Sequence, residues 1–290
     1  MFVNNQSDKS NIDIKHERAF DYYMNLAKDW KDPLPAPVIK KVDGYNVVDE
    51  SVLGEIGSKG RFGDLLFSQI KEKTIVYCQP RFGWAGISLC YLAKKYNKRL
   101  ILFMPASKEA SQHQLVTIEK GAIPIFMRIA AMPNLNKAAK EYADDLGAFF
   151  IPLGLKHELV TAAIVKTASD LFYSDLTEPR EMWTVISTGV LTRGLQIALP
   201  GTKFWAVAVA RNIQPGELGR ANFFSYDKSF SWSLKKQPMT IDSALNYDAK
   251  GLEIMRDYGS TGAYFWNVAG EIAPQILTPH DVKSNVQWLI

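Results

Sequence analysis

Cysteine is nearly absent from this chain of 290 residues, which has only Cys78 and Cys90, each within an apolar stretch. Two such cysteines indicate reduced core residues and argue against a disulfide framework or a cysteine-rich zinc site. Long apolar runs are absent too: none is long enough to cross a bilayer, and the polar N-terminus has no apolar core of signal-peptide length. We therefore expect a cytoplasmic protein with no membrane association.

Charge of one sign is also scarce. The 34 basic and 30 acidic residues leave a net charge of +4, and no block of like charge exceeds a Lys-Lys pair. So small and dispersed an excess does not by itself indicate nucleic-acid binding. The four histidines show no metal-ligand spacing, so no metal site is predicted. Neither a Gly-x-Ser-x-Gly elbow nor a P-loop is present, which argues against the corresponding hydrolases and nucleotidases.

What the chain does contain is a regular alternation of short apolar strands and helices. We predict strands at 74–78, 99–104, 123–127, 148–152, 183–186, 204–209 and 263–266. We predict helices between them at 87–96, 107–119, 134–146, 158–173 and 191–199. This alternation predicts an α/β fold with mostly parallel sheets covered by helices on both faces. Such sheets bind ligands at the carboxyl ends of their strands.

Two regions stand outside this alternation. Residues 1–14 are expected to be loose and residues 15–30 helical, followed by an extended linker that contains three prolines between residues 33 and 37. Residues 211–245 are rich in aromatic and polar groups, and we expect them to form a lid or an interface insert.

The most informative short motif is Gly57-Ser58-Lys59-Gly60-Arg61, which precedes a helix-like run from Phe62 to Ile70. A lysine in a Gly/Ser turn at the start of a helix suits Schiff-base chemistry. The small residues let a flat cofactor approach, and partial desolvation lowers the pKa of the amine. The plainer interpretation is an exposed turn lysine, with Asp49 and Asp64 orienting Arg61.

Three further loops lie next to predicted strands. The first contains Arg81, Phe82, Gly83 and Trp84, the second runs from Ser187 to Gly194, and the third from Asn267 to Gly270. The second loop combines hydroxyls, glycines and a helix N-terminus, which are the ingredients of a phosphate cradle. Plainer interpretations are an N-cap for this loop, a packing role for the tryptophan and a surface position for the arginine.

The order of these motifs resembles the fold type II pyridoxal-phosphate enzymes, above all the D-cysteine desulfhydrase and ACC deaminase branch, with cysteine synthase more distant. The resemblance extends from about Pro33 to Gly270. It rests on the Lys59 turn, Phe103-Met104-Pro105, Lys120-Gly121-Ala122, the Ser187–Leu191 loop in place of Gly-Thr-Gly-Gly-Thr, and Tyr247-Asp248-Ala249-Lys250 in place of Tyr-x-Gly-Lys.

The resemblance implies an architecture of two open, mostly parallel sheets with helices on both faces, as in the tryptophan synthase β type. It implies an N-terminal tail and helix at 1–32, a larger cofactor-binding domain of 33–73 plus 153–290, and a smaller α/β domain at 74–152. It also implies a homodimer.

The resemblance further implies lyase or deaminase chemistry at Cα or Cβ of an amino-acid-like substrate, with pyridoxal 5'-phosphate held by a Lys59 Schiff base. Lys59 would act as the base and Tyr247 as an acid or hydroxyl donor to the leaving group. The other implied cofactor contacts are Trp84, Ser187, Thr188, Gly189, Val190, Leu191 and Thr192, with Arg193 as a further phosphate candidate. The implied substrate contacts are Arg81, Phe82 and Gly83.

Three positions depart from the family pattern and leave alternatives open. Phe82-Gly83-Trp84 replaces a Ser-x-Asn segment, Val190 replaces a glycine of the phosphate loop, and Val268 stands near the place of the acid or hydroxyl that meets the pyridine nitrogen. One alternative is therefore a non-catalytic scaffold that binds a ligand or a partner protein.

The other alternative is an enzyme acting on modified nucleotides or DNA. Aromatic and basic residues that suit base stacking gather in one region: Phe223, Phe224, Tyr226, Phe230 and Trp232 with Arg211, Arg220, Lys228, Lys235 and Lys236. The same aromatic residues also suit a lid or an oligomer interface.

Overall fold

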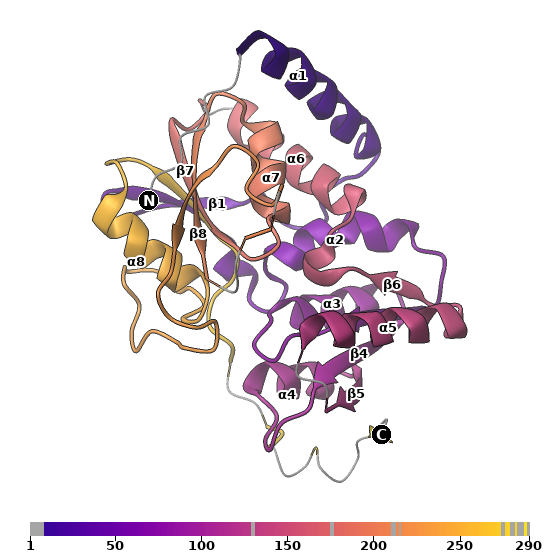
Figure 1. Cartoon of the computed structure of the whole chain (residues 1–290). Coiled ribbons are helices and arrows are strands. Elements are labelled where there is room, and N and C mark those ends of the chain that lie inside the picture. The colour runs from indigo at the N-terminus through magenta and orange to yellow at the C-terminus, as the bar shows by residue number, and fades with distance from the viewer. Residues whose placement is uncertain are drawn as a thin grey trace. The chain divides into compact units, whose positions relative to one another are not determined.

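The computed structural model describes residues 9–128, 131–174, 177–209, 213–214, 216–273, 276–278, 282 and 287–288. The chain forms two compact units, each built from two separate segments (Figure 1). Unit 1 comprises Met1–Phe62 and Glu158–Glu271, and unit 2 comprises Gly63–His157 and Ile272–Ile290. The predicted α/β class with two mostly parallel sheets is confirmed.

The six-stranded sheet of unit 1 has the order β1-β2-β10-β7-β8-β9. Its strands are β1 (Val38–Val42), β2 (Tyr45–Asp49), β7 (Glu181–Ile186), β8 (Lys203–Ala208), β9 (Asn222–Ser225) and β10 (Tyr264–Asn267). Only the β1–β2 pair is antiparallel, so the carboxyl ends of β2, β10 and β7 lie at one edge. Every residue of β7 is buried, as expected for a central parallel strand covered on both faces.

Helices cover both faces of this sheet. The helical elements of the unit are α1 (Lys9–Leu26), η1 (Glu50–Leu53), α6 (Glu158–Tyr173), α7 (Val190–Ala198), α8 (Asp248–Tyr258) and the start of α2 (Gly57–Gln69). Helix α8 lies on one face, and α7 with α6 lies on the other (Figure 1). The face under α8 carries an apolar core of unit 1.

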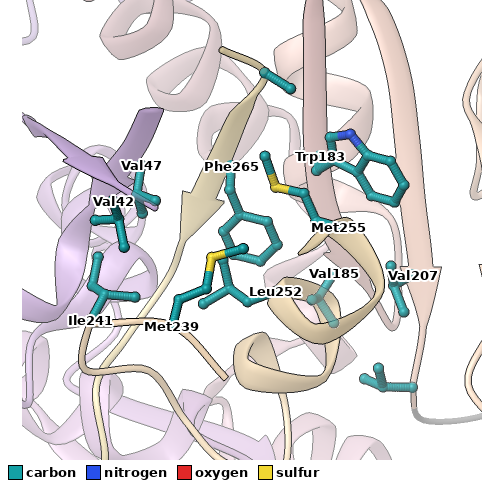
Figure 2. Close-up of a cluster of buried hydrophobic side chains, with 12 residues drawn as sticks. Val42, Val47, Trp183, Val185, Val207, Met239, Ile241, Leu252, Met255 and Phe265 are labelled. Atoms are coloured by element: carbon teal, nitrogen blue, oxygen red, sulfur yellow. The ribbon is translucent and has the colours of Figure 1, made fainter. Parts of the chain in front are cut away.

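Figure 2 shows this core, in which Phe265 of β10 lies beside Leu252 and Met255 of α8. Leu252 and Met255 are three residues apart and therefore share one side of the helix. Val185 and Val207 extend the cluster across the neighbouring strands. Each such side chain contributes about 1.5–3 kcal/mol on full burial, which fixes α8 against the strands.

Unit 2 has a five-stranded parallel sheet in the order β11-β5-β4-β3-β6. Its elements are β3 (Thr74–Cys78), α3 (Ala85–Lys95), β4 (Arg99–Pro105), α4 (Gln112–Glu119), β5 (Ile123–Met127), α5 (Met132–Leu146), β6 (Phe149–Ile151), η2 (Leu153–Leu155) and β11 (Gln287–Trp288). Helix α5 packs Leu135, Ala139 and Ala143, spaced four residues apart, onto the sheet.

The predicted start of one unit 2 helix was wrong. Ser107 was expected to cap a helix through Glu119, but α4 begins only at Gln112. Ser111 is the N-cap instead, because it forms a capping box with Gln114. The backbone amide of Gln114 donates to the Ser111 hydroxyl at 3.3 Å, and the backbone amide of Ser111 donates to Gln114 Oε1 at 2.9 Å. The Ser107 hydroxyl donates to the Glu109 carbonyl in a local turn.

Two predictions in unit 1 also need correction. The N-terminal helix spans Lys9–Leu26 rather than 15–30, so part of the segment expected to be loose is helical; residues 1–8 lie outside the described residues. Within the expected insert at 211–245, residues Asn222–Ser225 form β9, which pairs in parallel with β8. None of the helices in the described part of the chain has the length and apolar character needed to cross a membrane.

Candidate active site

Two parallel strands of unit 1 end in polar, buried surroundings. β2 ends at Asp49 and β10 ends at Asn267, and both side chains are fully buried. The Asn267 amide donates to Asp49 Oδ1 at 3.0 Å and to the Asp242 carbonyl at 2.8 Å. Lys40 Nζ lies 2.6 Å from Asp49 Oδ2. This edge of the sheet therefore carries an organised polar network at the position where open α/β sheets bind ligands.

Lys59 lies beside this edge, in the first turn of α2. The expected turn is thus the helix start itself, and it is anchored to the loop after β10 because the Ser58 amide donates to the Val268 carbonyl at 2.9 Å. The Lys59 amine lies 5.9 Å from the centroid of the Tyr247 ring. Burial lowers the pKa of Lys59, and the negative charge of Asp248 opposes that change. The amine is therefore easier to deprotonate than that of an ordinary lysine.

Asp248 belongs to the motif that begins at Tyr247, but it was not itself predicted as a site residue. Its side chain is fully buried at the start of α8, and its Oδ2 accepts a hydrogen bond from the Val268 amide at 3.0 Å. Its Oδ1 has no hydrogen-bond partner among the described residues. Burial raises the pKa of Asp248 to about 7, although the Val268 amide and the Lys59 amine act in the opposite direction.

Asp248 thus places a carboxyl group next to Val268, from a different segment of the chain. The signal that identifies it is its place directly after Tyr247, within the four residues that resemble Tyr-x-Gly-Lys.

Tyr247 connects Lys59 to the end of β7. Its hydroxyl donates to the carbonyl of Val185 at 3.4 Å, one residue before the strand ends. Its ring meets the Phe230 ring edge to face, with centroids 6.2 Å apart and an interplanar angle of 87°. Burial raises the pKa of Tyr247, so the hydroxyl keeps its proton. The structure therefore brings Lys59, Tyr247 and Asp248 together.

The predicted phosphate loop follows β7 directly. Gly189 has φ 71°, and a Cβ there would collide with the Glu217 carbonyl, so glycine is required. Helix α7 begins at the next residue and directs its first amides toward the loop. Ser187 and Thr188 are half-buried, whereas the Thr192 hydroxyl is buried and lies 2.9 Å from that of Thr184.

Arg193 holds the same loop in place through hydrogen bonds to backbone carbonyls. Its Nη1 donates to the carbonyls of Thr188, Gly216 and Glu217 at 3.2–3.3 Å. These contacts fix the loop against the segment that crosses it, and all three come from one nitrogen of the guanidinium. Burial lowers the pKa of Arg193, while the Glu217 carboxylate opposes that change.

Arg61 does not have the partners predicted for it. It is 1% exposed, and its Nε donates to Glu50 Oε2 at 2.8 Å while Nη1 pairs with Asp32. Asp49 pairs with Lys40, and Asp64 is paired elsewhere, so neither orients Arg61. Residues two apart on a helix face different sides, which directs Arg61 away from Lys59.

In unit 2, the predicted substrate residues form an aromatic cluster of their own. The Arg81 guanidinium lies 5.3 Å from the Phe82 ring. Phe82 and Trp84 both meet His113 edge to face, with centroids 6.2 and 6.3 Å from its ring. Burial lowers the pKa of His113 to about 4, so the imidazole is neutral. Trp84 Nε1 is buried without a hydrogen-bond partner among the described residues. Gly83 separates Phe82 from Trp84 in the sequence.

Most aromatic residues of 211–245 have neighbours within unit 1. Phe224 stacks on Trp183 with centroids 5.6 Å apart, and the rings of Tyr226 and Trp232 lie over the Lys250 amine. Phe223 is 48% exposed. Of the predicted basic partners, Arg220 donates to the backbone and Lys228 pairs with Asp227, while Lys235 and Lys236 are exposed and Arg211 lies outside the described residues.

Comparison with known proteins gives a structural match only. No family model matches the sequence, and no curated protein matches it. An ACC deaminase homologue matches with a TM-score of 0.72 at 15% identity, covering 86% of this chain and 94% of that one. A threonine deaminase from T.th. matches with a TM-score of 0.64 at 13% identity, covering 89% of this chain and 99% of that one.

Diaminopropionate ammonia lyase from Escherichia coli, in complex with an aminoacrylate-PLP azomethine reaction intermediate, matches with a TM-score of 0.62 at 12% identity, covering 92% of this chain and 91% of that one. The matches extend over most of the chain. The chain therefore has the fold of the fold type II pyridoxal-phosphate enzymes, as the order of its sequence motifs predicted.

Proposed function

We propose that this protein is a pyridoxal-phosphate-dependent enzyme that acts at Cα or Cβ of an amino-acid-like substrate. The observation that carries the proposal is that the half-buried Lys59 and the fully buried Asp248 are held at the same place, the carboxyl edge of the unit 1 sheet: the Ser58 amide donates to the Val268 carbonyl, and Asp248 accepts a hydrogen bond from the Val268 amide. An amine with a lowered pKa, next to a carboxylate with one unsatisfied oxygen, is an expensive arrangement in a protein interior. Such arrangements are concentrated at functional sites.

The residues present fit the chemical groups of the cofactor. The Lys59 amine would hold its aldehyde by a Schiff base, and the Asp248 carboxylate, with Oδ1 unsatisfied, would pair with its pyridine nitrogen. The amides at the start of α7 and the hydroxyls of Ser187 and Thr188 would hold its phosphate, since a helix N-terminus favours anions. When bound, pyridoxal phosphate supplies an electron sink for negative charge at the substrate Cα.

The protein side chains would then handle the protons. Lys59 would take a proton from the substrate Cα, because its lowered pKa makes the uncharged amine easier to form than in an ordinary lysine. Tyr247 keeps its proton and would donate a hydrogen bond to a leaving group. In unit 2, Arg81 is proposed to pair with a substrate carboxylate, and Phe82 and Gly83 are the other proposed substrate contacts.

The test is the visible absorption spectrum of the purified protein, with and without added pyridoxal phosphate and before and after borohydride. We expect a chromophore that borohydride reduces, and a reduced adduct that peptide mapping places on Lys59. Lys59→Ala should abolish it, and Lys71→Ala, which removes an exposed lysine, should not. A reducible chromophore that survives in the Lys59→Ala protein would contradict the assignment.

The non-catalytic scaffold remains the second candidate, because one observation favours it. The Arg193 guanidinium is bound to backbone carbonyls, and the nearby Glu217 carboxylate is 7% exposed, so negative charge lies beside the phosphate loop. Val190 also removes the second glycine of that loop. A wild-type protein that stays colourless with added pyridoxal phosphate would favour this candidate.

A further inference from the structure

Lys250 is a buried lysine that the proposed chemistry does not use. It lies in the first turn of α8 with 0% exposure, and its amine donates to the Ser229 carbonyl at 2.9 Å. The same amine lies 5.3 Å from the centroid of Tyr226 and 5.9 Å from that of Trp232. A buried ammonium is costly unless such partners replace water, so these contacts make up a specific environment.

These contacts fasten the segment 226–232 to α8. At one end of the segment, the Tyr226 hydroxyl donates to Glu253 Oε2 at 2.5 Å, about one turn after Lys250. In the middle, the Ser229 carbonyl accepts both the Lys250 amine and the Trp232 amide, the latter at 3.1 Å. The segment is therefore held at both ends and at its centre, with Lys250 as the common partner.

The fastened segment reaches the candidate active site through one ring. Phe230 lies between Ser229 and Trp232 in sequence, and it packs edge to face on Tyr247 at 6.2 Å. The Tyr247 ring in turn lies 5.9 Å from the Lys59 amine. A continuous series of contacts thus leads from Lys250 to Lys59.

We propose that Lys250 is a positioning residue for the Lys59 site: by fastening segment 226–232 to α8, it holds Phe230 against Tyr247 and keeps water from the Lys59 amine. The importance given to Lys59 rests on the proposed function, but the packing itself needs no cofactor.

The test uses the full chain after treatment with hydroxylamine, which removes bound carbonyl compounds. Two quantities are measured: hydrogen exchange of segment 226–232, and the pH midpoint of Lys59 acetylation by acetic anhydride, read by mass spectrometry. We expect Lys250→Met to speed exchange about tenfold. It should also raise the Lys59 midpoint by about one pH unit, because water reaches the amine. The matched control Lys236→Met, at an exposed lysine, should change neither.

A second variant separates positioning from simple structural support. Phe230→Leu removes the ring that packs on Tyr247, so it should raise the pH midpoint of Lys59 acetylation. It leaves the Lys250 contacts intact, so it should not speed exchange at Tyr226. The double variant should shift the midpoint no further than Lys250→Met alone, because both residues act through the same contact. Faster exchange in Lys250→Met with an unchanged Lys59 midpoint would overturn the proposal. If Lys250→Met does not fold, an unchanged midpoint in Phe230→Leu overturns it.

Neither readout requires the cofactor, so the two proposals can fail separately. A wild-type protein that binds no pyridoxal phosphate contradicts the proposed function and leaves the Lys59 shift intact. A coloured wild-type protein with no Lys59 shift in either variant contradicts only the positioning role.

Discussion

Asp248 shows how far single residues could be assigned from the sequence. Lys59 was predicted as a site residue because its signal is local, a lysine among small residues at the start of a helix, and its role stays a prediction. Asp248 was missed because its role depends on the contact with Val268, twenty residues away and made only by the packing of α8 against β10. The partners of Arg61 were mispredicted for a similar reason, since Asp32 and Glu50 meet it only in the folded chain.

The buried carboxyl of Asp248 predicts an unusual dependence of stability on pH. Its folded pKa of about 7 lies above the ordinary value of 3.8. Between those values the unfolded chain loses the proton first, so this group disfavours the folded state increasingly as the pH rises, and most of all above 7. Asp248→Asn should raise the free energy of unfolding at pH 8 by roughly 1–4 kcal/mol, because a pKa shift of one unit corresponds to about 1.4 kcal/mol.

The measurement is urea unfolding of both proteins between pH 4 and 8. The variant should also show a flatter profile between pH 4 and 7, and exposed Asp227→Asn is the control. A variant less stable than wild type at pH 8 would contradict this expectation, because it would show that the surroundings of Asp248 fully offset the cost of burying its charged carboxylate. Under the proposed function, this variant is expected to gain stability and to lose affinity for pyridoxal phosphate.

At the scale of elements, the sequence was most reliable for strands buried on both faces. β3 and β7 are short, apolar and surrounded by turn signals, and both were predicted within two residues of their ends. β9 was missed because it lies at the sheet edge, where its half-exposed side chains lack a continuous apolar run. The start of α4 was misplaced because two serines precede it and only Gln114 determines which one caps.

The packing of α6 on α7 depends on a glycine. A Cβ at Gly194 would lie 2.6 Å from Ile164 Cγ2, so Gly194→Ala should lower the free energy of unfolding by about 1–3 kcal/mol. Ile164→Ala alone should cost about 2–5 kcal/mol through its cavity. The double variant should be more stable than the sum of the two effects, because the new methyl group enters the vacated space. Urea unfolding of all four proteins checks this, and strict additivity would contradict direct contact.

For the whole molecule, the most consequential fact is that each unit combines distant parts of the chain. Alternation of strands and helices predicts layers, but it does not say which segments share a layer. β2 pairs with β10 across more than two hundred residues, and β11 pairs with β5 after the chain has completed unit 1. Neither pairing was predicted from the sequence, and the domain bounds implied by the family resemblance placed residues 153–290 together in the larger domain.

This organisation predicts a local effect of shortening the chain. A variant that ends at Glu271 lacks β11, so β5 becomes the edge strand of the unit 2 sheet. We expect hydrogen exchange to accelerate at least about tenfold for the β5 amides that pair with β11, while β3 and the unit 1 strand β7 keep their protection. Uniform loss of protection in both units would instead mean that residues 272–290 are needed for folding as a whole.

Trp183 and Trp205 face each other on adjacent strands, with centroids 5.4 Å apart and planes inclined by 18°. Indole rings this close share their electronic excitation, so the pair is expected to produce a split circular dichroism band that a lone tryptophan does not give. The rings stack only when β7 and β8 are in register. The molecule therefore carries an intrinsic optical reporter of strand alignment that requires neither a label nor a bound ligand.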